Sequence, residues 1–234
     1  PRFAGGAADA RTSEPCHGVS FFEGTPVDGR GMPPALAAVS RLVAGFLKRR
    51  RLARLERMPA AERDYHRRLY AAQGDKAILL EAGRKKLLGR PLAALALPDF
   101  VDPTIAEMKR QARIGAIERS PLVPTVLPLQ IVRLGALAIV CCPGEFTTTA
   151  GARLVESVAD VLRPAGVRHA LICTYANDYM GYVTTREEYR EQCYEGGHTI
   201  FGQWTLAAFQ TRFTALAGEM LRPPGERRHD RSTR

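Results

Sequence analysis

A carboxylate and several phenols stand in two short segments where an α/β protein can build a site. The first segment, Cys142 to Gly151, places Glu145 directly after an apolar run and before a helical pattern. The second, residues 177–189, places Tyr179 and Tyr182 after the next apolar run. Carboxylate and phenol oxygens can accept hydrogen bonds, transfer protons or bind a metal ion. These residues are therefore the candidate chemical site.

Strand and helix patterns indicate how the two segments meet. Residues 129–140 form an apolar, partly β-branched run that predicts a strand covered on both faces. A helical stripe follows from Thr147 and ends at Pro164, and residues 167–174 predict a second strand. Such a βαβ unit is right-handed and parallel, and its loops at the carboxyl ends of the strands share one crevice. We predict an α/β fold whose mixed sheet contains at least one parallel βαβ unit.

The same residues also have simpler interpretations. Glu145 precedes a helix N-terminus, where a carboxylate contributes about 0.3–1 kcal/mol without any chemistry. A tyrosine in such a loop commonly makes a half-buried packing contact with its hydroxyl bonded. Residues 184–188 have the spacing of a capping box, either Thr184 with Glu187 or Thr185 with Glu188, which predicts a helix start. A lone histidine at position 198 is predicted to be a loop hydrogen bonder.

Several segments resemble one enzyme family in their order and spacing. Residues 127–131, the Pro-Gly-Glu-Phe-Thr-Thr block at 143–148, residues 177–189 and residues 194–202 together resemble the catalytic domain of the neutral/alkaline, non-lysosomal ceramidases. Two further stretches, residues 18–31 and 73–80, resemble the family's glycine-rich segment and its Lys-Pro-Ile-Leu-Leu stretch. The resemblance covers residues 18 to 215 in patches and is densest after residue 125.

The resemblance implies a zinc-dependent amidohydrolase. The family hydrolyses the N-acyl amide of ceramide to sphingosine and a fatty acid, with zinc held by two histidines, a glutamate and a tyrosine. By motif, Glu145 and Tyr182 match the glutamate and tyrosine metal ligands, and Tyr194 matches a catalytic-pocket tyrosine. Tyr179 is an alternative candidate for the ligand, or a residue that packs beside it. Zinc accepts oxygen and nitrogen ligands, activates water and polarises a carbonyl, which suits amide hydrolysis.

Other motifs of the family do not occur in this sequence. We find neither the Gly-Asp-Val-Ser-Pro-Asn type segment nor the two zinc histidines, and the five histidines do not form His-x-His or His-Glu-x-x-His. The first residue is Pro rather than Met. We expect an incomplete portion of a larger catalytic domain, inactive alone, whose zinc site is completed by histidines outside this chain. The alternative is a non-catalytic homologue that acts as a binding or interaction module.

Composition indicates a folded chain with a basic surface. The 234 residues are 45% hydrophobic and carry a formal net charge of +10. Basic residues gather at 48–57 and in the tail, which fits an anionic membrane surface, nucleic acid or a solvated helix face. No aromatic residues interleave the basic run, which argues against nucleic acid. The partner implied by the resemblance is a lipid, a ceramide-like N-acyl sphingoid.

The chain divides by composition into three parts. We predict a disordered N-terminal segment at residues 1–17, the ceramidase-like catalytic-domain portion at 18–221, and a basic disordered tail at 222–234. The resemblance implies a secreted or membrane-associated protein, and the compartment stays open. The sequence carries no signal peptide and no run of about 18 apolar residues.

Overall fold

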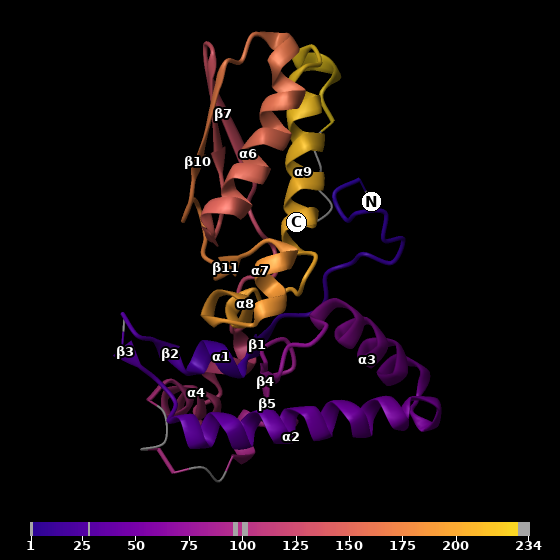
Figure 1. Cartoon of the computed structure of the whole chain (residues 1–234), viewed down its shortest axis with the longest axis vertical. Coiled ribbons are helices and arrows are strands. Elements are labelled where there is room, and N and C mark those ends of the chain that lie inside the picture. Colours follow the sequence, from indigo (N-terminus) through magenta and orange to yellow (C-terminus); the bar gives the residue numbers. More distant parts are fainter. Residues whose placement is uncertain (1, 28, 96–97, 100–102, 229–234) are drawn as a thin grey trace.

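One end of the molecule is a three-stranded sheet with two helices packed on one face (Figure 1). The computed structural model describes residues 2–27, 29–95, 98–99 and 103–228. In this sheet β8 (Leu137–Cys141) runs parallel to β10 (His169–Cys173) and antiparallel to β7 (Gln130–Leu134). Helix α6 (Thr148–Leu162), followed by the short η3 (Arg163–Ala165), connects β8 to β10. The predicted α/β class, with a mixed sheet and a parallel βαβ unit, is confirmed.

Two details of the predicted sheet are wrong. The apolar run at 129–140 is a hairpin rather than one strand, because Gly135 turns the chain with φ 60° between β7 and β8. An apolar run does not reveal such a turn by its periodicity. The sheet is also not covered on both faces: α6 and α9 (Thr205–Met220) cover one face, and Leu171 on the other is 57% exposed.

The core of this end lies between the sheet and its two helices. Val140 of the sheet, Leu154 and Val158 of α6, and Phe213 of α9 are fully buried in one cluster. The helical stripe predicted from Thr147 is confirmed: the Thr147 hydroxyl caps α6 by accepting from the Ala150 amide at 3.4 Å. The cap fixes where the chain turns from the Glu145 segment into the helix.

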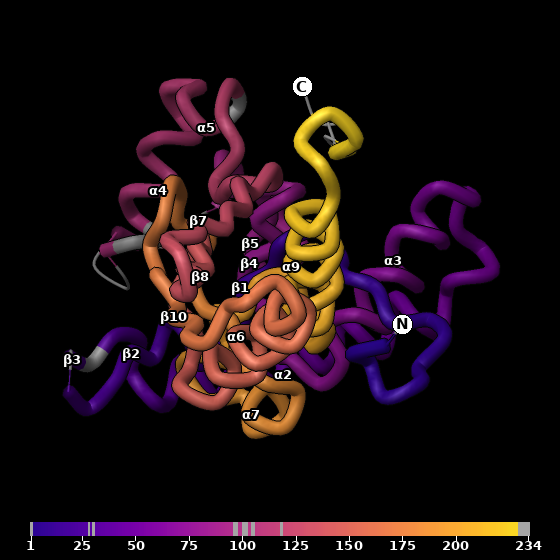
Figure 2. Tube along the Cα trace, turned by 90° about the horizontal axis from the view of Figure 1, so that it is seen from above, coloured from indigo at the N-terminus to yellow at the C-terminus, as the bar shows by residue number. Residues whose placement is uncertain are grey.

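The other end is built around the long helix α2 (Pro34–Ala53) and a small antiparallel sheet. The sheet order is β1 (Cys16–Gly18), β4 (Ile78–Glu81), β5 (Lys86–Leu87) and β6 (Arg90–Pro91). Figures 1 and 2 show α3 (Ala60–Gln73) toward one end of α2, and α4 (Pro103–Arg113) toward the other. The short elements here are α1 (Val19–Phe22), β2 (Gly24–Thr25), β3 (Gly29–Arg30), η1 (Leu55–Arg57), η2 (Leu92–Ala94) and α5 (Ala116–Arg119).

Between the two ends lie β9 (Glu145–Phe146), β11 (Tyr182–Val183), α7 (Arg186–Glu191) and α8 (Tyr194–His198) (Figure 1). Of the two predicted capping boxes, the structure forms Thr185 with Glu188 at the start of α7. Glu188 also accepts from the Thr147 hydroxyl at 2.7 Å, so one carboxylate joins the caps of α6 and α7. Both helix starts are thereby fixed next to β9 and β11.

The carboxyl-terminal end of the chain contains η4 (Pro224–Glu226). Of the tail predicted at residues 222–234, positions 229–234 lie outside the described residues. Within the described part of the chain, no helix combines the length and the apolar character that a bilayer span requires.

Candidate functional site

Glu145 and Tyr182 lie directly opposite each other in a two-stranded parallel ladder. β9 pairs with β11 in the register Glu145 to Tyr182 and Phe146 to Val183. The Glu145 amide donates to the Gly181 carbonyl at 2.9 Å, which holds the two segments together. Residues opposite each other in a ladder project to the same face of it. The two predicted ligand positions, which come from consecutive βα loops, are therefore brought together.

Three phenols lie near the Glu145 carboxylate. The Tyr179 hydroxyl donates to Glu145 Oε1 at 2.5 Å, and the hydroxyls of Tyr175 and Tyr182 lie close enough to lower the pKa of this carboxylate. The Tyr175 and Tyr179 rings stack with centroids 5.8 Å apart, so the loop presents both hydroxyls together. Tyr179, the alternative ligand candidate, therefore also lies in direct contact with Glu145.

The charges of these groups follow from their surroundings. Burial raises the pKa of Glu145, but the hydrogen bonds from Tyr175, Tyr179 and Tyr182 outweigh it and leave the pKa below its usual value. Burial and the Glu145 carboxylate together raise the pKa values of Tyr179 and Tyr182. At neutral pH the site is therefore an anionic acceptor among neutral donors, an arrangement that favours a cation or a proton donor.

Tyr194, the predicted pocket tyrosine, packs against the same cluster from α8. Its ring meets the Tyr182 ring edge to face, with centroids 5.6 Å apart at 77°. The Tyr194 ring also packs against Phe21 of α1, with centroids 5.4 Å apart. The structure thus brings all three predicted site residues, Glu145, Tyr182 and Tyr194, into one cluster.

Two buried histidines, His17 and His198, pack with Phe21 beneath this cluster, and we call these three rings its floor. The rings of His17 and His198 lie 5.0 Å apart, and Phe21 packs 4.0 Å from His198. Neither Nδ1 atom has a hydrogen-bond partner among the described residues, so the predicted role of His198 as a loop hydrogen bonder is not seen at that atom. Only the fold brings His17 and His198 together, and no local spacing signals the pair.

Burial keeps both histidines neutral. Burial and then the nearby Lys76 lower the pKa of His198 to about 4, although Glu145 acts in the opposite direction. Burial and the neighbouring His198 likewise lower the pKa of His17. The floor under the tyrosines is therefore aromatic, and its two buried histidines are uncharged at neutral pH.

Close backbone approach at Gly181 shapes the site. Its φ is 90°, and a Cβ atom at this position would lie 2.6 Å from His198 Nε2. Glycine alone adopts this conformation without strain and leaves room for the ring. Gly181 therefore allows β11 to pass over His198 and still place Tyr182 opposite Glu145.

Lys76 connects the segments that carry His17 and His198 through buried hydrogen bonds. Its side chain is 2% exposed, and Nζ donates to the carbonyls of Thr199 at 2.8 Å and Cys16 at 3.3 Å. These bonds connect β1, which carries His17, to the residue after α8. Lys76 belongs to the 73–80 stretch that carries part of the family resemblance, and its position explains how that stretch supports the site.

The side chains that the structure describes at this site include some, but not all, of the ligands that a zinc ion needs. Within the described ranges, no three His, Cys, Asp or Glu side chains gather closely enough to hold a metal ion. Glu145 and Tyr182 nevertheless supply two oxygen donors from adjacent strands, one of them anionic. Structural and catalytic zinc sites use three or four protein ligands. The residues fit part of a zinc site, and further ligands are needed to complete it.

Comparisons with known proteins find relatives from one enzyme family. Residues 106–211 match the family model of neutral/alkaline non-lysosomal ceramidase, N-terminal. A neutral ceramidase of Pseudomonas aeruginosa is 46% identical over 112 residues, which are 48% of this chain and 17% of that protein. A neutral ceramidase of Mycobacterium tuberculosis is 40% identical over 149 residues, 63% of this chain and 22% of that protein. The solved structure of a ceramidase complexed with C2 is similar at TM-score 0.50 and 36% identity, covering 70% of this chain and 19% of that one.

These matches confirm the predicted resemblance to the neutral/alkaline ceramidase family. Glu145, Tyr182 and Tyr194 all lie inside the matched segment, whereas α2 lies outside it. The matched part of the chain spans 17% and 22% of the length of these two curated relatives.

Proposed function

We propose, from the premise that residues 106–211 share the ceramidase catalytic domain, that this chain contributes to hydrolysis of a ceramide-like N-acyl amide. The products are a sphingoid base and a fatty acid. The observation that carries the proposal is the pairing of Glu145 with Tyr182, which puts a carboxylate and a phenol on one face of one ladder. These two residues are the ones that the family resemblance assigns to the metal.

Glu145 and Tyr182 are proposed as two oxygen ligands of a zinc ion, with two histidines from outside this chain as the others. Zinc bound there lowers the pKa of its water from about 15.7 to about 7 and polarises the substrate carbonyl. The support from this chain is electrostatic: Glu145 is held as an anion, and a nearby cation favours the phenolate of Tyr182. Tyr179 orients the carboxylate through its hydrogen bond at 2.5 Å.

Tyr194 is proposed as the residue that donates to the amide oxygen as it gains charge. The rings of Tyr182 and Phe21 both pack against the Tyr194 ring and restrict its movement. A donor aimed at such an oxygen commonly contributes about 2.7–4 kcal/mol to transition-state stabilisation. The aromatic floor of His17, Phe21 and His198 strengthens that interaction because it keeps water away from one side.

The test is ceramide hydrolysis by the product of the natural gene, with whatever sequence flanks these residues. We expect Glu145→Gln and Tyr182→Phe each to lower kcat/KM by about 100-fold or more, in the range of lost metal or oxyanion contacts. Tyr175→Phe is the matched control: it removes a hydroxyl from the same carboxylate, but Tyr175 is 60% exposed, and we expect less than about a tenfold change. Full activity in both ligand variants contradicts the assignment.

A non-catalytic binding module is the second candidate. It is supported by the motifs that these 234 residues lack, since they contain neither the serine segment nor a His-x-His or His-Glu-x-x-His motif. This candidate predicts that the natural gene product binds a short-chain ceramide but releases no fatty acid, with or without added zinc. Release of fatty acid that depends on zinc rules it out.

A further inference from the structure

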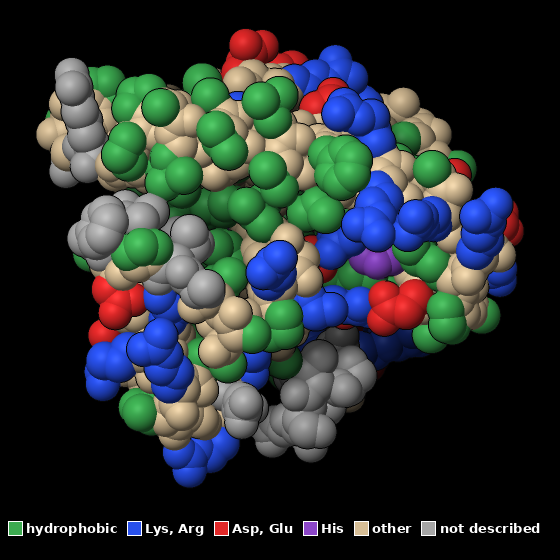
Figure 3. Space-filling view, turned by 90° about the horizontal axis from the view of Figure 1, so that it is seen from below, with side chains coloured by type: hydrophobic (Ala, Val, Ile, Leu, Met, Phe, Trp, Pro, Cys, Tyr) green, Lys and Arg blue, Asp and Glu red, His purple; other side chains and the backbone are tan. Residues whose placement is uncertain are grey.

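The outward face of α2 is apolar and uncovered by the described residues. Val39, Leu42, Val43 and Phe46 recur at helical spacing, and their exposed fractions are 55%, 73%, 37% and 55%. The inner face of the helix packs through small residues, Ala37, Ser40 and Ala44. Figure 3 views this side, where hydrophobic side chains form a band across the molecule. Single exposed apolar residues are ordinary, but a contiguous stripe on one helix marks an interaction surface.

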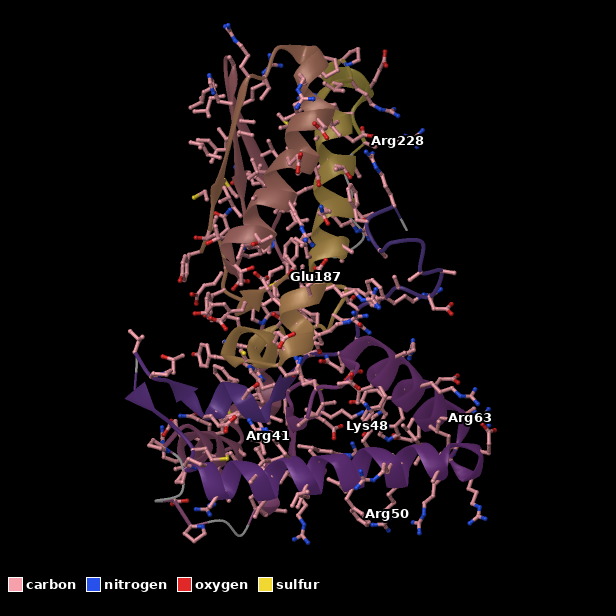
Figure 4. The ribbon with its side chains drawn as sticks, in the orientation of Figure 1. Arg41, Lys48, Arg50, Arg63, Glu187 and Arg228 are labelled. Carbon is pink, nitrogen blue, oxygen red and sulfur yellow. The ribbon has the colours of Figure 1, made fainter. Side chains whose placement is uncertain are left out.

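Arginines continue the same surface beyond the stripe. Arg49, Arg50 and Arg54 are exposed, and none has an ion-pair partner among the described residues. By contrast, Arg51 pairs with the Glu81 carboxylate at 2.7 Å, and Lys48 donates to the Gly74 carbonyl at 2.7 Å. In Figure 4 Arg50 points away from the molecule and Lys48 points into it. Lys and Arg side chains lie beyond one end of the apolar band (Figure 3). Lys48 and Arg51 therefore make contacts that stabilise the fold, whereas the three exposed arginines form no ion pair with the described residues.

The combination favours a lipid surface over the other partners of a basic helix. Nucleic acid requires cations and stacking or polar side chains, and it leaves an aliphatic stripe unexplained. If the outer face of α2 were only exposed to water, the arginines would be explained. The four exposed apolar side chains at helical spacing would not be. An anionic bilayer accepts both parts: apolar side chains enter the boundary of the acyl chains, and guanidinium groups pair with headgroup phosphates.

We propose that the outer face of α2 binds the surface of an anionic lipid bilayer, with the helix lying parallel to it. Val39, Leu42 and Phe46 enter the headgroup and acyl boundary, and Arg49, Arg50 and Arg54 contact lipid phosphates. The helix has 20 residues, so about 30 Å of it can lie along the surface. The proposal is independent of the hydrolytic function, because α2 lies outside the matched residues 106–211 and vesicle binding requires no turnover.

Vesicle cosedimentation of the product of the natural gene, with whatever sequence flanks these residues, tests the charge part of the surface. We expect binding to phosphatidylcholine vesicles that contain phosphatidylglycerol, weaker binding as salt increases, and little binding to phosphatidylcholine alone. Arg49→Gln/Arg50→Gln should lower the partition coefficient by about fivefold for each charge removed. The matched control Arg168→Gln/Arg190→Gln removes two exposed arginines elsewhere and should leave it unchanged.

A second pair of variants tests the apolar part. Leu42→Ser/Phe46→Ser should lower the partition coefficient by about tenfold or more, because both side chains leave the acyl boundary. Leu134→Ser is the control, since Leu134 is 61% exposed in β7, at the opposite end of the molecule from α2 (Figure 1). Circular dichroism checks that every variant is folded, as expected for substitutions at exposed positions.

Three results overturn the proposal. One is equal vesicle binding by the α2 variants and their controls. Another is a stable dimer in sedimentation that Leu42→Ser/Phe46→Ser converts to monomer, which assigns the stripe to a second copy. The third is binding to duplex DNA that depends on Arg49 and Arg50 while vesicle binding does not, which assigns the arginines to nucleic acid.

Discussion

At the level of single residues, the candidate chemistry depends on which side chains carry charge. Glu145 is held as an anion by three phenols, while Tyr179 and Tyr182 remain neutral beside it. Without a cation, the phenols donate to the carboxylate. With a cation, the same oxygens become a ligand pair, because positive charge favours both ionised forms. One arrangement thus serves the resting site and the proposed metal site.

The lowered pKa values of the buried histidines make the free energy of unfolding depend on pH. The pKa of His198 is lowered to about 4 by burial, so between about pH 6.5 and 4 the unfolded chain binds a proton that the folded chain does not. Stability should therefore fall as pH decreases through this window, by up to about 3 kcal/mol from His198. Denaturant unfolding at a series of pH values measures the slope.

The variant His17→Phe/His198→Phe should flatten that slope. It keeps two aromatic rings in the floor but removes both titrating groups. Phe21→Leu is the control: it disturbs the same packing without removing a proton site, so it should lower stability and keep the slope. An unchanged slope in the histidine variant would show that other groups cause the acid sensitivity.

The sequence could predict the oxygen-bearing residues but not their surroundings. Glu145 and Tyr182 follow consecutive strands of a βαβ unit, and that topology requires neighbouring loops. His17 and Phe21 come from a segment far away in the chain. Only tertiary packing places Phe21 beside Tyr194, and His17 beside the His198 ring that packs against Tyr182. No periodicity or spacing encodes a contact of that kind.

At the level of elements, the site depends on two strands of two residues each. β9 and β11 are too short to be recognised from alternation, which needs at least about four residues. The hairpin of β7 and β8 was likewise hidden inside one apolar run, because Gly135 and Ala136 do not interrupt it strongly. By contrast, the sequence predicts α6 and its start at Thr147, because helical periodicity and an N-cap residue are local signals.

Gly181→Ala tests the ladder. A residue with a Cβ atom at φ 90° is strained by about 1–3 kcal/mol, and the clash with His198 Nε2 adds to that cost. We expect lower unfolding free energy in denaturant titrations. Gly218→Ala is the matched control: a Cβ atom at that position in α9 would meet nothing within 4 Å, and alanine should stabilise the helix by about 0.5–1 kcal/mol. Equal effects of the two substitutions would contradict the close approach at Gly181.

At the level of the whole molecule, the main apolar cores of the two ends are joined by buried polar contacts. One core lies under the β7, β8 and β10 sheet and the other under α2 and β4. Gln73 donates to the Ile200 carbonyl at 2.7 Å, and the Tyr189 hydroxyl donates to the Gln73 carbonyl at 2.9 Å. With Lys76, these residues connect α3 and β4 to the segment that carries Tyr194. The division into parts at residues 17 and 221 stays a prediction.

Lys76→Met tests this connection through pH. Burial lowers the pKa of Lys76 to about 7, against about 10.4 in an unfolded chain. Between these values the unfolded chain binds more protons, so the Lys76 contribution should rise with pH by at most about 1.4 kcal/mol per unit. The stability difference between wild type and Lys76→Met should therefore change in favour of wild type from about pH 7 to 10. A constant difference would mean that Lys76 does not titrate in that range.

The most direct test of the account is the position of zinc in crystals of the natural gene product. Anomalous diffraction at the zinc edge should give a peak within bonding distance of a Glu145 carboxylate oxygen, about 2.0–2.2 Å, and of the Tyr182 hydroxyl oxygen. A zinc peak bound elsewhere, with the Tyr179 hydroxyl still donating to Glu145 and no metal near Tyr182, would contradict it.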